Sequence, residues 1–130
     1  MGSEMCIRDR LTKYIKLLGS RNDTVELYQG MDAFFLPSFF EGLPVTGVEA
    51  QAMGLSMVVS DTVTREMVYT DLVDYVSLND TPEAWASRLE IALRKNAKRE
   101  QYADRLKLSN FSNIGCGNRL EQVYCWWING

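Results

Sequence analysis

Short apolar runs alternate along the chain with segments whose apolar residues recur at helical spacing. The apolar runs predict strands at Tyr14–Leu18, Ala33–Leu36, Met57–Ser60 and Val73–Leu78. Helices are predicted at Thr24–Gln29, Pro44–Met53 and Lys98–Leu108, together with one helix that Thr81 begins and a last one that Ser112 begins. Strands that are apolar throughout and alternate with helices are typical of a parallel sheet covered on both faces. The chain is therefore predicted to be an α/β protein.

Residues with clear capping roles mark the ends of these helices. Asp23 is expected to cap the first helix. Pro44 suits the first position of the next helix, and Gly54 stands just past its end. Thr81 is predicted to cap a third helix, with Pro82 at its first position. The apolar stripe of that helix is expected to comprise Trp85, Leu89 and Leu93.

The composition is that of one packed domain in a chain of 130 residues, with 46% hydrophobic and 24% charged residues. The net charge is −3, so overall charge does not attract the chain to nucleic acid. The lack of histidine excludes a Ser-His-Asp or Cys-His catalytic centre and a His-based metal site within this sequence. Three cysteines without Cys-x-x-Cys spacing are typical of free thiols. No apolar run approaches the roughly 20 residues of a membrane-spanning helix.

The two ends of the chain differ from its middle. Met1–Arg10 is polar, has no period and is similar to translated adapter or vector sequence. We interpret these residues as a non-native tail, expect a natural chain that was cut off upstream, and assign residues 11–130 to one partial domain. At the other end, Trp126 and Trp127 are expected to dock on a surface.

The loops beyond the carboxyl ends of the strands are the expected place for a ligand. These loops are Gly19–Asp23, Pro37–Leu43 and Asp61–Arg65. The second contains Glu41, and Glu49 follows after seven intervening residues, in the second turn of the next helix. The free first-turn N–H groups of that helix suit a phosphate or a hydroxyl-bearing ligand. Gly42 and Gly47 leave the backbone bare, and a glycine inside a helix indicates a close approach there.

Glu49 is predicted to lie at the edge of a core-facing stripe formed by Val45, Val48 and Ala52. A carboxylate in that position is costly unless donors reach it. A vicinal diol, from a sugar ring or a ribose, would supply two donors. The residues alone leave an alternative open, in which Glu41 is a solvated loop residue and Glu49 an ordinary helix former.

The stretch from Leu18 to Asp61 resembles the donor-binding half of glycosyltransferase family 4, whose members are retaining enzymes with the GT-B fold of two Rossmann-like domains. Glu41 and Glu49 match the Glu-x7-Glu hallmark of that family. Its aspartate-hydrophobic-Pro-Ser strand is matched by Asp32–Ser38, and its Glu-Ala-x-Ala-x-Gly helix end by Glu49–Gly54. The short Glu-Gly-Leu-Pro form is similar to the branch that builds bacterial exopolysaccharide and capsule. The resemblance covers most of residues 13–128.

The resemblance implies a role for each matched position. Glu41 would contact hydroxyls of the donor sugar, and Glu49 would hold the ribose diol of the nucleotide. The backbone facing the sugar and diphosphate would be that of Gly42, Leu43, Pro44 and Val45. The loop near the base would be that of Ser20, Arg21 and Asn22. The resemblance implies a UDP- or GDP-sugar as substrate, a glycan or lipid-linked acceptor, and no catalytic residue, metal or cofactor within this chain.

The sequence departs from the family in three places. Pro44 comes two residues earlier than in the common Glu-Gly-Phe-Gly-Leu-Pro form. Of the family's Gly-Gly-x-x-Glu after the next strand, only Glu66 corresponds. The Arg/Lys pair that neutralises the phosphates, like the acceptor domain, lies upstream in the family. Arg21 is a candidate substitute for one of these cations, and its ordinary interpretation is a solvated loop arginine. We therefore expect the chain by itself not to transfer sugar.

Other functions stay open beside sugar transfer. One is a non-catalytic nucleotide- or sugar-binding module, and another is a nucleotide-sugar epimerase of the same architecture. A phosphoacceptor signalling domain is excluded, because Asp32 precedes its strand and no lysine follows Leu78 at the required place.

Two residue clusters have an ordinary structural interpretation. Of the phenylalanines near Pro37, we expect Phe34 and Phe35 in the core, whereas Phe39 and Phe40 follow in the loop. The basic run of Arg94, Lys95, Lys98 and Arg99 is interpreted as a solvated helix face in a cytoplasmic protein. Its alternative is peripheral contact with the anionic inner membrane.

Overall fold

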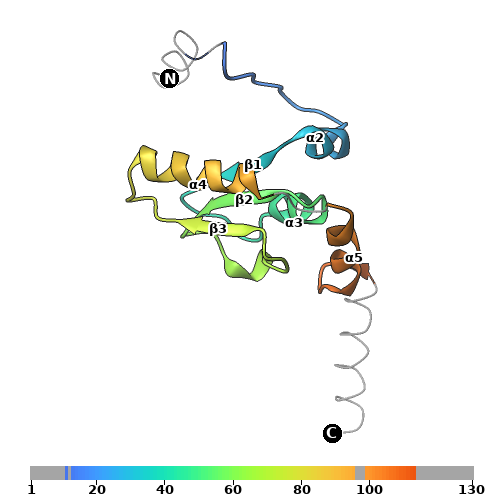
Figure 1. Cartoon of the computed structure of the whole chain (residues 1–130). Helices are drawn as coiled ribbons and strands as arrows, with labels where there is room; N and C mark the ends of the chain where they lie inside the picture. The colour runs from blue at the N-terminus through green and yellow to red at the C-terminus, as the bar shows by residue number, and fades with distance from the viewer. Residues whose placement is uncertain (1–10, 12, 96–98, 114–130) are drawn as a thin grey trace, which may run out of the picture.

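The computed structural model describes residues 11, 13–95 and 99–113 and contains a three-stranded parallel sheet with strand order β1-β2-β3. The strands are β1 (Ala33–Leu36), β2 (Ser56–Ser60) and β3 (Val73–Val76). The helices are α2 (Thr24–Gly30), α3 (Val45–Ala52), the 3₁₀ turn η1 (Arg65–Met67), α4 (Pro82–Arg94) and α5 (Glu100–Leu108). Figure 1 shows α4 on one face of the sheet and α3 on the other. This arrangement confirms the predicted Rossmann-like α/β class.

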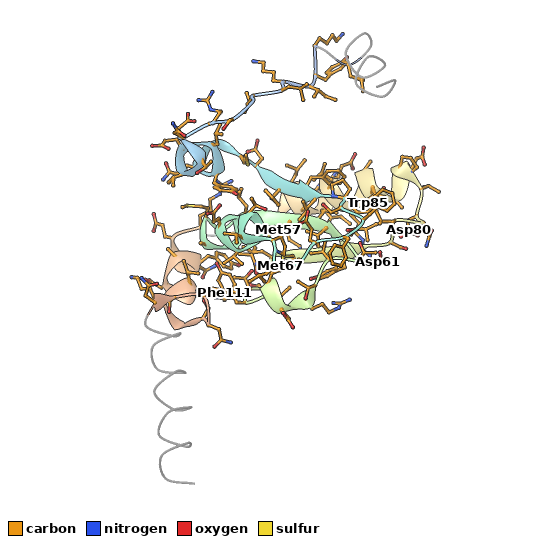
Figure 2. The ribbon with its side chains drawn as sticks, turned by 180° about the vertical axis from the view of Figure 1, so that it is seen from behind. Met57, Asp61, Met67, Asp80, Trp85 and Phe111 are labelled. Carbon is orange, nitrogen blue, oxygen red and sulfur yellow. The ribbon has the colours of Figure 1, made fainter. Side chains whose placement is uncertain are left out.

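The central strand β2 is fully buried because both of its faces are covered. Met57 and Val59 point into the cluster that α3 and η1 cover, whereas Val58 packs with Val76 and Ala92 beneath α4. Side chains alternate between the faces of a strand, so an all-apolar strand needs a cover on each side. Met57 and Trp85, both labelled in Figure 2, accordingly belong to different core clusters, one on each face of the sheet.

The predicted strand at Tyr14–Leu18 is wrong. Residues 15–19 have no regular structure and lead away from the sheet (Figure 1). Tyr14 is 72% exposed and Leu17 is 78% exposed. A strand is stable only where a neighbour pairs with its N–H and C=O groups. Within the described residues, β1 pairs with β2 and no strand pairs with the segment before α2.

The helix starts follow the predicted signals at α4 and only in part at α2 and α3. The hydroxyl oxygen of Thr81 accepts a hydrogen bond from the N–H of Ala84 at 3.3 Å, and Pro82 opens α4. Pro44 is the N-cap of α3 rather than its first residue. Asp23 occupies the N-cap position of α2, but its carboxylate pairs with Arg21 and does not cap the helix. The predicted helix after Ser112 lies outside the described residues.

The predicted apolar stripe of α4 holds only in part. Trp85 and Leu89 pack beneath the helix and Ala92 is buried, but Leu93 is 51% exposed. Ala92 follows Leu89 at a spacing of three, which lies on the same side of a helix as the spacing of four between Trp85 and Leu89. The buried side of α4 therefore comprises Trp85, Leu89 and Ala92.

The phenylalanines divide between the core and the surface. Phe34 packs on the core cluster beside Tyr28, as predicted. Phe35 was expected in the core but is 45% exposed, with its ring 5.3 Å from that of Trp85 in an edge-on contact. Phe39 and Phe40 are each 84% exposed in the loop after β1.

Most of the basic run has partners within the domain. The Lys95 ammonium lies 2.7 Å from an Asp74 carboxylate oxygen, and Arg94 lies 4.0 Å from Glu90. The Arg99 guanidinium donates to the carbonyl oxygens of Gln29 and Met31. Lys98 lies outside the described residues. None of the helices in the described part of the chain is long and apolar enough to cross a membrane.

Candidate functional site

The loop Pro37–Leu43 leaves the carboxyl end of β1 and leads into α3, as the sequence predicts. Its base is fixed by the neighbouring strand. Ser60, the last residue of β2, donates its hydroxyl to the carbonyl oxygen of Ser38. The hydroxyl of Thr62 donates to the same oxygen at 2.8 Å. The structure thus brings two of the three predicted loops together, those after β1 and β2. The loop Gly19–Asp23 follows no strand.

Glu41 is half-buried in this loop. The hydroxyl of Ser38 donates to its carboxylate oxygen Oε1 at 2.8 Å. The next residue, Gly42, has open space at its Cα, because a Cβ added there would meet no atom within 4 Å. A ligand can therefore approach the backbone at Gly42 closely, while Ser38 restrains the carboxylate beside it.

The N-terminus of α3 lacks a capping side chain. The carbonyl oxygen of Pro44 accepts hydrogen bonds from the N–H groups of Gly47 and Val48. Leu43 and Val45, on either side of Pro44, are 47% and 60% exposed. An uncapped helix start with exposed neighbours presents N–H groups and a positive partial charge to an approaching anion. The backbone from Gly42 to Val45 is consequently suited to a phosphate group.

The predicted core-facing stripe of α3 holds at Val48 but fails at Val45, and the environment of Glu49 changes with it. The buried residues of α3 are Gly47, Val48, Ala50 and Gln51, whereas Val45 is exposed. Glu49 lies on the exposed side of the helix. Its carboxylate therefore keeps contact with water, and the expected desolvation cost in the empty site does not arise.

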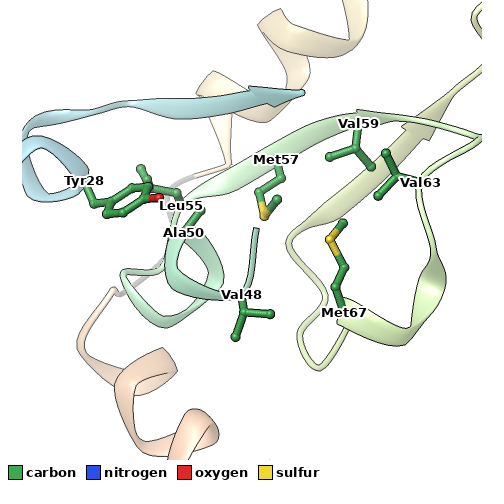
Figure 3. Packing of buried hydrophobic residues seen from close by; sticks show 8 residues of the cluster. All are labelled: Tyr28, Val48, Ala50, Leu55, Met57, Val59, Val63 and Met67. Atoms are coloured by element: carbon green, nitrogen blue, oxygen red, sulfur yellow. The ribbon is translucent and has the colours of Figure 1, made fainter. Parts of the chain in front are cut away.

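Gly47 is explained by the protein core rather than by a ligand. A Cβ at Gly47 would lie 2.8 Å from the sulfur of Met67 and 3.3 Å from the methyl carbon of Met57. Both methionines are fully buried beside α3 (Figure 3). The glycine lets α3 pack closely on these side chains.

A groove of about 330 Å³ lies between α2 and α3 and extends to α5 and the residues just after it. Its walls include Val25 and Tyr28 of α2, Val45 and Glu49 of α3, and Leu106 and Phe111. Tyr28 donates its hydroxyl to the Glu49 carboxylate oxygen Oε2 at 3.1 Å. Carboxylate and phenol are thus joined at one place in an otherwise mostly apolar groove.

Tyr28 is the site residue that sequence reasoning missed. Burial, followed by the hydrogen bond to Glu49 and the negative charge of that group, raises the pKa of Tyr28 to about 12. The phenol therefore stays protonated at neutral pH and acts as a donor. Tyr28 precedes Glu49 by 21 positions, so no local sequence pattern links the two residues. The only signal for Tyr28 is its place in a predicted helix.

The predicted base-proximal loop is exposed, and its arginine already has a partner. The Arg21 guanidinium makes two hydrogen bonds to the Asp23 carboxylate. This pairing raises the pKa of Arg21 and lowers that of Asp23. Ser20 and Asn22 are exposed beside it. The predicted substitute for the family's phosphate-binding cation is therefore held within its own loop.

The remaining sequence candidates add no metal chemistry. Glu66 lies exposed in η1, where its N–H donates to the hydroxyl oxygen of Thr64 at 3.3 Å. Within the described residues, no group of three or more Cys, Asp and Glu side chains could hold a metal ion.

Known proteins with similar sequences share this region. The sequence profile of the family described as "Glycosyl transferases group 1" matches residues 3–95. The match begins within Met1–Arg10, a segment outside the described residues, so the non-native tail stays a prediction. No solved structure matches the chain significantly.

Three curated bacterial proteins illustrate the similarity. EpsF of Bacillus subtilis (strain 168), which its name assigns to the glycosyltransferases, is 32% identical over 96 residues, covering 73% of this chain and 25% of EpsF. An N,N'-diacetylbacillosaminyl-diphospho-undecaprenol alpha-1,3-N-acetylgalactosaminyltransferase of Campylobacter jejuni is 53% identical over 47 residues, covering 36% of this chain and 12% of that protein. A UDP-Gal:alpha-D-GlcNAc-diphosphoundecaprenol alpha-1,3-galactosyltransferase of Escherichia coli is 45% identical over 51 residues, covering 39% of this chain and 13% of that protein.

The matched region spans a quarter or less of each of these relatives. The family profile, by contrast, matches residues 3–95, which include the whole sheet together with α2, α3 and α4. Because the profile runs from residue 3 to residue 95 without leaving out the site, the chain belongs to the group 1 glycosyl transferases.

Proposed function

We propose that this chain is the donor-binding part of a retaining glycosyltransferase that takes its sugar from a nucleotide sugar. The observation that carries the proposal is the placement of Glu41 and Glu49 around the uncapped start of α3, beyond the carboxyl end of a parallel strand. Three kinds of group follow one another along this stretch: a carboxylate in the loop, free helix N–H groups and a carboxylate in the second turn of the helix.

Each group suits a different part of a nucleotide sugar. The first-turn N–H groups of α3 would face the diphosphate, where the helix dipole favours negative charge. Glu41, restrained by Ser38, would accept hydrogen bonds from hydroxyls of the donor sugar. Glu49 would accept the two hydroxyls of the ribose. These residues position the donor and stabilise the leaving diphosphate, and none of them acts as a nucleophile.

The acceptor is proposed from the relatives. The names of the C. jejuni and E. coli proteins both specify a sugar attached to diphosphoundecaprenol, and the E. coli name gives UDP-Gal as donor. We propose an acceptor of the same class, a lipid-linked glycan, in the synthesis of a bacterial surface polysaccharide. The protein would then act in the cytoplasm at the inner membrane, on a donor that carries UDP or GDP.

Glu49→Gln tests the assignment of the ribose site. We would titrate the chain with UDP, with GDP and with the 2′,3′-dideoxy form of the nucleotide that binds better, using calorimetry. A hydrogen bond to a charged group contributes about 1.5–3 kcal/mol. The substitution should therefore weaken ribonucleotide binding roughly tenfold to a hundredfold. The dideoxynucleotide should bind the parent weakly and respond little to the substitution.

The control is Glu90→Gln, which makes the same change of charge on the exposed face of α4. It should leave both affinities unchanged. Unfolding in urea should be similar for all three proteins, because Glu49 is exposed and an amide oxygen can still accept from Tyr28. Equal losses for the ribo and dideoxy ligands would mean that Glu49 has no role in ribose recognition. Failure of the parent to bind any of these nucleotides would refute the proposed function.

A further inference from the structure

We propose that Tyr28 is a positioning residue, which fixes the Glu49 carboxylate in the orientation that accepts a ribose diol. This inference rests on the proposed function of Glu49 and assigns a role to a second residue of the same site. The contact that carries it is the hydrogen bond of 3.1 Å from the Tyr28 hydroxyl to Glu49 Oε2.

The ring of Tyr28 is held by the core, so its hydroxyl has a fixed position. The side chain is 7% exposed and belongs to the main hydrophobic cluster. Its ring centroid lies 6.1 Å from that of Phe34. The hydroxyl also lies 3.4 Å from the carbonyl oxygen of Thr46, in the first turn of α3. A buried ring on α2 therefore brings one polar atom to the groove that Glu49 borders.

Glu49 needs such a restraint because it is exposed. A glutamate side chain on a helix surface samples several rotamers, and fixing it when a ligand binds reduces the affinity. A donor that already holds Oε2 removes part of that cost. Oε1 and the remaining lone pair of Oε2 stay free to accept two hydroxyls.

The hydrogen bond has only one possible direction. The pKa of Tyr28 is raised to about 12, so the phenol keeps its proton at neutral pH and donates to the carboxylate. The carboxylate cannot donate in return. Tyr28 thus occupies one acceptor position of the Glu49 carboxylate and leaves the others to a ligand.

Tyr28 could instead be a simple brace between α2 and α3, and Tyr69 allows the two roles to be separated. The Tyr69 hydroxyl donates to the carbonyl oxygen of Val48 at 2.9 Å, so it also braces α3. Burial raises its pKa to about 12 as well. The single hydroxyl proton of Tyr69 is donated to Val48, whereas the hydrogen bond to Glu49 comes from Tyr28, so Tyr69→Phe removes a comparable hydrogen bond without releasing the carboxylate.

The test compares Tyr28→Phe with Tyr69→Phe by calorimetry, using the ribonucleotide that binds the parent best and its 2′,3′-dideoxy form. Tyr28→Phe keeps the ring against Phe34 and removes only the oxygen. It should weaken ribonucleotide binding about three- to tenfold, which corresponds to the cost of immobilising one long side chain when the ligand binds. The affinity for the dideoxy form should not change. Tyr69→Phe should change neither affinity. In a Glu49→Gln background, Tyr28→Phe should have a smaller effect than in the parent.

The outcomes separate this inference from the function on which it rests. If Glu49→Gln lowers ribonucleotide affinity but Tyr28→Phe does not, the positioning role is refuted and the ribose site stands. Equal losses for the ribo and dideoxy forms in Tyr28→Phe would also refute it, because a brace acts on both ligands alike. If the parent binds no nucleotide, both the proposed function and the role of Tyr28 are wrong.

Discussion

Gly54→Ala should destabilise the domain strongly, for two separate reasons. Gly54 follows α3 with a φ of +67°, a backbone conformation that residues with a Cβ rarely adopt. Its N–H donates to the carbonyl oxygen of Gln51, and the N–H of Leu55 donates to that of Ala50, so the turn closes the helix. A Cβ at Gly54 would also lie 2.7 Å from the Cα of Arg99, at the start of α5.

The two contributions can be estimated separately. A left-handed backbone costs a residue with a Cβ roughly 1–2 kcal/mol. Forcing an extra carbon against a packed backbone costs roughly 1–3 kcal/mol more. Arg99 cannot move away easily, since its guanidinium donates to the carbonyl oxygens of Gln29 and Met31. We therefore expect a loss of about 2–5 kcal/mol in the free energy of unfolding.

Gly19→Ala is the matched control. Gly19 has the same φ of +67°, but a Cβ there would meet no atom within 4 Å. Both substitutions reduce the entropy of the unfolded chain equally. Urea unfolding of the two variants therefore separates backbone strain from the collision with α5. If Gly54→Ala costs no more than Gly19→Ala, the packing of Gly54 against Arg99 does not contribute and the reasoning is refuted.

Two further predictions concern buried polar groups. The buried Gln51 amide pairs with the carbonyl oxygens of Gly47 and Met67, the N–H of Tyr69 and the hydroxyl of Thr70. Each buried polar group left unpaired costs about 1–3 kcal/mol. Gln51→Met should therefore lower the free energy of unfolding, measured in urea, by roughly 2–4 kcal/mol. A loss below about 1 kcal/mol would mean that water replaces these bonds. Stability should also fall at alkaline pH, because the pKa values of Tyr28 and Tyr69 rise from 10.0 to about 12 on folding. Their contribution is fully present below pH 10 and is lost as the pH rises through about 12. Urea unfolding from pH 8 to pH 11.5 should show the decline, and Tyr69→Phe should reduce it; an identical decline in that variant would contradict the assignment.

The local sequence determines the elements of the sheet and the ends of its helices. Ala33–Leu36 ends at Pro37, and Thr81 with Pro82 begins α4. Gly54 ends α3 because few other residues adopt its backbone conformation. These signals act within a few residues, so they can be interpreted without knowledge of the rest of the molecule.

The sequence also indicates where the site lies, through the order of its elements. A parallel strand followed directly by a helix places the loop between them at the carboxyl edge of the sheet. Glu41 and the start of α3 lie there, as expected. The order of elements does not identify the ligand or the reaction, and the match to the group 1 glycosyl transferases is the stronger indication of both.

Only the tertiary structure decides which side of α3 faces the core. Val45, Val48 and Ala52 form one plausible apolar side, yet the helix exposes Val45 and buries Gly47, Ala50 and Gln51 beside Val48. The small residues let α3 approach the sheet closely, and the Gln51 amide satisfies polar groups that come from η1 and the loop after it. Glu49 then faces outward, where Tyr28 holds it.

The same distinction explains two further differences between sequence and structure. The apolar run Tyr14–Leu18 has strand composition, but a strand forms only where another strand pairs with it. The contact between Tyr28 and Glu49 joins α2 to α3 across 21 positions, and no local pattern encodes it. Local propensity and capping thus fix the elements of this protein, whereas backbone pairing and close packing determine their orientation and the surroundings of the site.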